Sequence, residues 1–143
     1  MKRTHIHLST DNLEASLAYY IALFGAEPVK REPDYAKWLL DDPALNFAIS
    51  THGGTTGISH LGISVDSDEE LDEVAARLRD ADAPATEESD ATCCYARSDK
   101  YWSHDPHGAV WELFRTFGES ETYGPGRNPE PKAGQCCAPN AAT

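Results

Sequence analysis

The sequence is built from two similar halves, and this repeat limits the folds that the chain can adopt. An alternating polar and apolar run at residues 5–10, typical of a β-strand, reappears at residues 60–65, so that His5 and His60 occupy equivalent places 55 positions apart. Each run is followed by a helix start, at Asp11 and at Ser67, with a glutamate three residues further on and an apolar stripe at helical spacing. Gly25 is expected to end the first helix.

A second correspondence follows each helix. The segment Lys37 to Pro43 resembles the segment Lys100 to Pro106, and an apolar strand follows each, at residues 45–50 and 109–116. This correspondence has an offset of 63 residues rather than 55, so the second half carries about eight extra residues between its helix and its Lys-Tyr-Trp strand. The insertion falls around residues 87–99, and we expect an irregular loop there.

Each half therefore reads strand, helix, strand, strand, strand. This order predicts an α+β fold of two βαβββ modules, related by a pseudo-twofold axis, whose mixed sheets bend around a shared metal-containing cleft. We expect one domain over residues 1–117, with modules at about 1–52 and 57–117. Residues 118–143 are rich in Gly, Pro, Asn and Ala, which predicts a flexible C-terminal tail; it carries the pair Cys136-Cys137.

Charge and composition narrow the range of partners. The 143 residues include 12 Lys and Arg against 24 Asp and Glu, a formal charge of −12, which disfavours nucleic acid and anionic membranes. No apolar run approaches the roughly 20 residues needed to span a bilayer, and the N-terminus lacks the apolar stretch of a signal peptide. We expect a cytoplasmic monomer or homodimer that acts on small molecules or metals, with its thiols reduced.

Three residues form a candidate metal site. Histidines at the same position of two repeat-related strands should meet at the pseudo-axis, which makes His5 and His60 a pair. Glu112 lies in an otherwise apolar strand, where a buried carboxylate is costly unless it binds a cation or a partner, and its counterpart in the first half, Ala48 or Ile49, cannot coordinate. His7 shares a face with His5 and is an alternative ligand, but its repeat mate is Gly62, so we prefer His5.

Two histidines and one carboxylate leave positions open on a bound metal. This ligand set is the facial triad of non-haem Fe(II) oxygenases, so Fe(II) is the expected cofactor. The same ligands can accept Mn(II), Ni(II), Zn(II) or Co(II), because affinity order alone favours several of these over iron.

These motifs resemble the vicinal oxygen chelate superfamily, which includes glyoxalase I, extradiol dioxygenases and the fosfomycin and bleomycin resistance proteins. The resemblance covers about residues 4–116. Within the superfamily, the segments Asp34 to Trp38 and Thr92 to Trp102 resemble the heavy-metal resistance branch, which contains organoarsenical carbon-arsenic lyases and cadmium-induced proteins. The shared features are His5, Asp11-x-Leu13-x-x-Ser16, His60-Leu61-Gly62, and Asp105-Pro106-x-Gly108 leading to Glu112-Leu113.

The resemblance implies an Fe(II)- and O2-dependent enzyme that cleaves the carbon-arsenic bond of trivalent organoarsenicals such as methylarsenite and releases arsenite. It places the metal on His5, His60 and Glu112, and the arsenical on Cys93 and Cys94, whose soft thiolates suit trivalent arsenic. Adjacent residues of a regular strand point to opposite faces, so the pair can chelate one atom only where the backbone is irregular.

Further roles and two rival functions stay open from the sequence. Lys100, Tyr95 or Tyr101 could supply a proton or order the loop, and Cys136-Cys137 could deliver arsenical to it. One rival function is an extradiol-type dioxygenase acting on a catechol, which leaves the cysteine pair without a role. The other is a thiol-based protein that binds Cd(II) or arsenite without catalysis.

Overall fold

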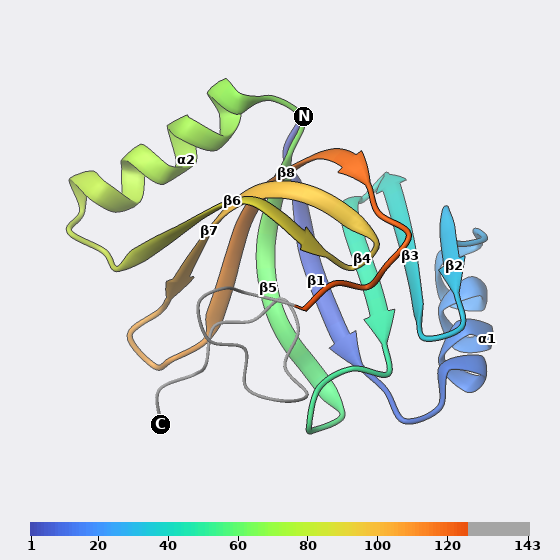
Figure 1. Ribbon diagram of the computed structural model, residues 1–143. Helices are drawn as coiled ribbons and strands as arrows, with labels where there is room; N and C mark the ends of the chain where they lie inside the picture. Colours follow the sequence, from blue (N-terminus) through green and yellow to red (C-terminus); the bar gives the residue numbers. More distant parts are fainter. Residues whose placement is uncertain (126–143) are drawn as a thin grey trace.

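A computed structural model of the chain describes residues 1–125, which form one curled eight-stranded sheet with two helices (Figure 1). The strands lie in the order β2-β3-β4-β1-β5-β8-β7-β6. The elements are β1 (Arg3–Ser9), α1 (Leu13–Phe24), β2 (Lys30–Glu32), β3 (Tyr35–Asp41), β4 (Ala44–Ser50), β5 (Gly57–Val65), α2 (Asp68–Asp80), β6 (Ala85–Cys93), β7 (Ala96–His104) and β8 (Val110–Glu119).

The predicted α+β fold of two βαβββ modules is confirmed. β1 to β4 with α1 form the first module, and β5 to β8 with α2 form the second. The modules join through the antiparallel pair β1 and β5, while each of these strands pairs in parallel with the last strand of its own module. In the central pair His5 lies opposite Gly62 and His7 lies opposite His60, which is the register that a twofold axis between the strands requires.

Local sequence explains where both helices begin and end. Ser67 caps α2 as predicted, because its side chain accepts the backbone N–H of Glu70. The cap of α1 is Asn12, one residue later than the predicted Asp11; the Asn12 side chain accepts the N–H of Ala15. Gly25 ends α1 in the left-handed conformation, with φ of 63°.

The two faces of the sheet have different chemistry, because side chains alternate along each strand. The helices cover the convex face, where α1 packs on Trp38 and Phe47 and α2 packs on Val65 and Leu113. Within each strand, alternate residues thus point to a hydrophobic side and to a polar side of the sheet. The polar residues face the concave side, where they line a cavity.

The insertion in the second module is not the irregular loop that we expected. It lengthens β6 and β7 to nine residues each, and only Cys94 and Tyr95 separate the two strands. Both turn residues have positive φ, 57° and 60°, as a two-residue type I′ hairpin turn requires. The extra residues therefore build a long hairpin, which is irregular at its tip and at a bulge between Glu88 and Ala91, where Asp90 has a φ of 50°.

Several residues beyond position 117 take part in the described fold. β8 continues to Glu119, and Tyr123 is buried against Tyr35 and Tyr95. The predicted pair Cys136-Cys137 lies outside the described residues. Within residues 1–125, neither helix is long and apolar enough to cross a membrane.

Candidate metal centre and cysteine pair

The three predicted ligands meet at the centre of the concave face. His5 comes from β1, His60 from β5 and Glu112 from β8, and all three side chains are buried. The two histidine Nε2 atoms are 3.3 Å apart, and Glu112 Oε2 lies 3.5 Å from the first and 3.1 Å from the second. Ligand atoms that share one ion at about 2.0–2.2 Å are separated by about 3 to 3.5 Å. The donor set therefore fits a single metal ion without rearrangement.

The hydrogen bonds of His5 point an unprotonated Nε2 toward the other candidate ligands. Its Nδ1 lies 3.0 Å from the backbone carbonyl oxygen of Asn46, and a carbonyl only accepts. Nδ1 therefore carries the ring proton, and Nε2 turns its lone pair to the cavity. Burial lowers the pKa of His5 to about 3, an effect that Glu112 only partly offsets, so the ring is neutral at pH 7.

Glu112 is held as a carboxylate by a buried lysine. Lys100 Nζ lies 2.6 Å from Glu112 Oε1, and only 4% of either residue is exposed. Burial alone would raise the pKa of Glu112, but the charge of Lys100 and the hydrogen bond with His60 outweigh it and hold the pKa well below its ordinary range. Conversely, the carboxylate outweighs the effect of burial on Lys100 and raises its pKa. One oxygen of Glu112 is thus paired with Lys100 while the other faces the histidines.

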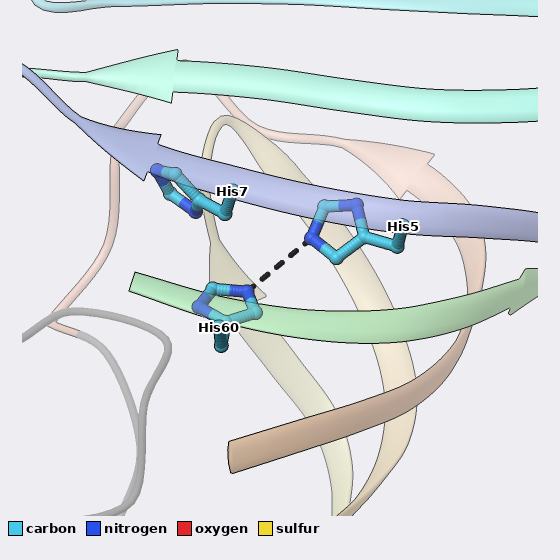
Figure 2. Close-up of side chains that lie close together, drawn as sticks. All are labelled: His5, His7 and His60. Atoms are coloured by element: carbon cyan, nitrogen blue, oxygen red, sulfur yellow. Dashed lines mark hydrogen bonds between the residues drawn. The ribbon is translucent and has the colours of Figure 1, made fainter. Parts of the chain in front are cut away.

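His7 lies beside His5 and His60, as Figure 2 shows. One ring nitrogen from each of His5, His7 and His60 lies within 4.8 Å of the other two. These three buried histidines could therefore hold a metal ion. His7 Nε2 is, however, 2.9 Å from Ser50 Oγ, a partner that occupies it. Glu112 Oε2 lies within 3.5 Å of both other candidate ligand atoms and adds negative charge, so Glu112 stays the predicted third ligand.

Cys93 and Cys94 line the same cavity as the metal-ligand candidates. Cys93 ends β6, and Cys94 begins the turn. The positive φ of Cys94 breaks the alternation of side chains, and the two Sγ atoms lie 2.9 Å apart. Cys93 is disulfide-bonded in this structure, contrary to the expected reduced thiols. Once Cys93 is reduced, the pair can bind a single soft atom, which a regular strand would not permit.

The other three candidates occupy three different environments. Lys100 lies in the cavity, where it contacts Glu112. Tyr101 follows it on β7 and packs with the α2 cluster on the convex face, so the structure does not bring it together with the other predicted site residues, because alternation turns it away. Tyr95 sits in the hairpin turn, and its hydroxyl donates to Asp34.

Two contributors to the site were missed in the sequence. Asn46 orients His5 and is a polar residue in the apolar strand β4, the same signal that identified Glu112 in β8. Gly62 permits close packing, because a Cβ there would lie 2.2 Å from the Glu112 carbonyl oxygen and 3.3 Å from His5. Gly62 stands in the shared motif His60-Leu61-Gly62, but its packing role depends on a contact between strands and could not be read from the sequence.

Paired βαβββ modules with buried histidines and a carboxylate on the concave face define a class of metal-site proteins, and comparison gives the family. Residues 2–113 match the model of the Glyoxalase/Bleomycin resistance protein/Dioxygenase superfamily. The chain belongs to this superfamily.

Relatives and solved structures agree with the family. The chain is 42% identical to the trivalent organoarsenical cleaving enzyme of Bacillus sp. (strain MD1), covering 100% of this chain and 94% of that one. It is 37% identical to the cadmium-induced protein CadI of Mycobacterium bovis, covering 96% and 93%. Its fold is similar to that of homoprotocatechuate 2,3-dioxygenase from Arthrobacter globiformis, with a TM-score of 0.60 and 14% identity over 86% of this chain and 38% of that chain. The relatives match the heavy-metal resistance branch that the sequence motifs indicated.

Substitution of Gly62 tests the close packing of the ligand strands. The G62A protein should lose about 3 kcal/mol of unfolding free energy in urea, because overpacking forces β5 and β8 apart, and it should bind Mn(II) more weakly. Gly54→Ala is the matched control, since a Cβ there meets nothing within 4 Å. Equal stability and metal affinity in the two variants would contradict this account.

Substitution of Lys100 tests the charge balance of the site. In metal-free protein, Lys100→Met should cost about 3 to 5 kcal/mol, because it leaves a buried carboxylate without its partner. Saturating Mn(II) should recover much of this loss, since the ion supplies the missing positive charge and binds only the folded state. Thermal unfolding with and without Mn(II) measures both effects, and a K100M/E112L double variant should regain stability without responding to the metal.

Proposed function

We propose that this protein is an Fe(II)- and O2-dependent enzyme that cleaves the carbon-arsenic bond of trivalent organoarsenicals. The observation that carries the proposal is that a cysteine pair and a two-histidine, one-carboxylate set line one cavity. The nitrogen and oxygen donors lie on the central strands. The sulfur donors, which are softer, lie on the tip of the β6-β7 hairpin that reaches over those strands (Figure 1).

The cysteine pair suits the arsenic atom of the substrate. Trivalent arsenic is soft and prefers sulfur ligands, so Cys93 and Cys94 would bind it as a dithiolate. The organic substituent, left as the third group on arsenic, would then extend into the cavity toward His5, His60 and Glu112. This orientation places the bond to be broken between the two donor sets.

Fe(II) bound at His5, His60 and Glu112 would supply the activation of O2. For methylarsenite the atoms balance with one O2: CH3As(OH)2 and O2 give As(OH)3 and CH2O, so the methyl carbon is oxidised and O2 is reduced. Lys100 keeps Glu112 ionised and fixes the oxygen that faces the histidines. Burial of this ligand set excludes bulk water from the reacting atoms.

The relatives support the proposal in different degrees. The Bacillus relative is named a trivalent organoarsenical cleaving enzyme, and the likeness extends over the whole of this chain. The mycobacterial relative is named only for its induction by cadmium, which favours a second candidate: thiol-based sequestration of Cd(II) or arsenite. An extradiol-type dioxygenase is less favoured, because it gives the cysteine pair no role.

Arsenic speciation tests the reaction directly. The protein is reconstituted with Fe(II) without oxygen, methylarsenite is added, O2 is admitted, and arsenic species and formaldehyde are quantified. We expect arsenite and formaldehyde in equal amounts, and only when Fe(II) and O2 are both present. Tight binding of methylarsenite without arsenite would overturn the lyase and favour sequestration.

The cysteine pair and the metal ligands should be separable by mutation. Cys93→Ser or Cys94→Ser should abolish arsenite production, because one thiolate cannot hold arsenic as a dithiolate, while each variant retains its Fe(II). Fe(II) content by chelator titration and arsenite release under O2 are the two measurements. Loss of Fe(II) from the serine variants would contradict the division of roles.

Glu112→Gln separates catalysis from sequestration. The amide keeps the shape of the side chain but removes the negative charge, so Fe(II) affinity should fall at least about 100-fold and cleavage should be lost. Arsenical binding by the thiols should persist, which dialysis against methylarsenite measures, with circular dichroism to verify folding. Arsenite formation at the wild-type rate would exclude Glu112 as a ligand.

A further inference from the structure

The turn that carries Cys94 is anchored to the opposite module. The hydroxyl of Tyr95, the second turn residue, donates to Asp34 Oδ1, and Asp34 lies between β2 and β3. Lys30 Nζ of β2 donates to the backbone carbonyl of Tyr95 over 3.0 Å. The hairpin tip of the second module is thus bound at two points to the first module.

Asp34 is itself fixed as an ionised acceptor. His52 Nε2 lies 2.7 Å from Asp34 Oδ2, so each carboxylate oxygen has its own partner. Burial would raise the pKa of Asp34, but the hydrogen bonds with Tyr95 and His52 outweigh it and keep the pKa below its ordinary value. The hydrogen bond to Asp34 raises the pKa of Tyr95 to about 12, so the tyrosine stays a donor at neutral pH.

A segment after β8 supports the tip from another side. The Cys94 N–H donates to the Tyr123 carbonyl over 2.6 Å, and the Tyr123 ring stacks on His52 at a centroid distance of 3.6 Å. Gly124 lies so near β6 that a Cβ would meet the Thr92 carbonyl oxygen at 2.1 Å. His52 contacts both Asp34 and Tyr123, and so it links the two sets of contacts that hold the turn.

The turn needs such support because of its backbone. Positive φ is uncommon for residues other than Gly, Asn and Asp, and type I′ turns favour those residues at both central positions. Here the positions hold Cys94 and Tyr95. Such a conformation persists when its surroundings determine it, and here it brings the two sulfur atoms together.

We propose that Asp34 and Tyr95 form a latch between the modules that holds the Cys93-Cys94 turn over the metal-ligand set. The proposal rests on the proposed function, because it assigns these two residues to positioning the arsenical-binding pair rather than to the reaction itself. Without the latch the tip would open away from the first module. The sulfur atoms would then lose their fixed distance from His5, His60 and Glu112.

The latch is tested with Tyr95→Phe in the full chain carrying C136S and C137S, which leaves Cys93 and Cys94 as the sole thiols. The probe is phenylarsine oxide, a trivalent arsenical. Its Kd should rise about tenfold, since a hydrogen bond to a charged group is lost, and hydrogen exchange at the Cys94 N–H should accelerate by a similar factor. Fe(II) stoichiometry should stay at the wild-type value.

Two further variants identify the latch as the cause. Asp34→Asn keeps an oxygen that can accept from Tyr95, so it should lie between wild type and Asp34→Ala in both probe affinity and exchange. Tyr19→Phe removes a hydroxyl from the exposed face of α1 and should change neither. With methylarsenite, the Tyr95 variant should raise KM while keeping kcat within about twofold, a split that general destabilisation would not produce.

The outcomes for the latch and for the proposed function can be told apart. Unchanged Cys94 exchange and probe affinity in Tyr95→Phe would overturn the latch, whatever the wild type does. Failure of the wild type to bind phenylarsine oxide would overturn the proposed substrate. Exchange would then still decide whether Asp34 and Tyr95 hold the turn.

Discussion

The buried carboxylate of Glu112 is the constraint on which the rest of the site depends. A charge inside a sheet is tolerated only with compensation, and here Lys100 supplies it on one oxygen while His60 contacts the other. Lys100 binds the first oxygen of Glu112, so the second oxygen faces the Nε2 atoms of His5 and His60. The Nε2 atom of His5 carries no proton. The ion pair therefore does more than neutralise a charge. It sets the direction of the carboxylate and so decides where a metal ion fits.

The symmetry of the fold and the asymmetry of the site arise from different parts of the sequence. The repeat places His5 and His60 at related positions, and the register of β1 with β5 brings them together. The candidate ligand Glu112 is present where the halves differ. In the strand register Glu112 lies opposite Gly62 in the second module, whereas Ala48 lies opposite His7 in the first. The β6-β7 hairpin is likewise longer than its counterpart β2-β3 in the first module, and it carries cysteines that the first module lacks.

Much of this arrangement could be predicted because it follows from periodicity and repetition. The module order, His5 and His60 as a pair, and Glu112 as an out-of-place charge are all visible in one dimension. The loop expected around residues 87–99 was wrong because hairpin and loop differ in strand pairing, and the pairing partner of β6 cannot be read from its polar sequence. Tyr101 was placed at the site although alternation from Lys100 already turned it to the other face. Asn46, Gly62 and the contact of Asp34 with Tyr95 depend on segments far apart in the chain, so local patterns could not identify the last two.

The position of the cysteines keeps the two donor sets of the proposed chemistry apart. If the thiols lay on a central strand beside the histidines, iron and arsenic would compete for one donor set, since thiolates bind soft and borderline ions alike. Here the sulfur donors lie on a hairpin tip, whereas the nitrogen and oxygen donors lie on the central strands of the sheet. A latch at the tip then makes the distance between the two donor sets a property of the contact between modules. In this proposal the distance between the two donor sets depends on Asp34 and Tyr95, which belong to neither set.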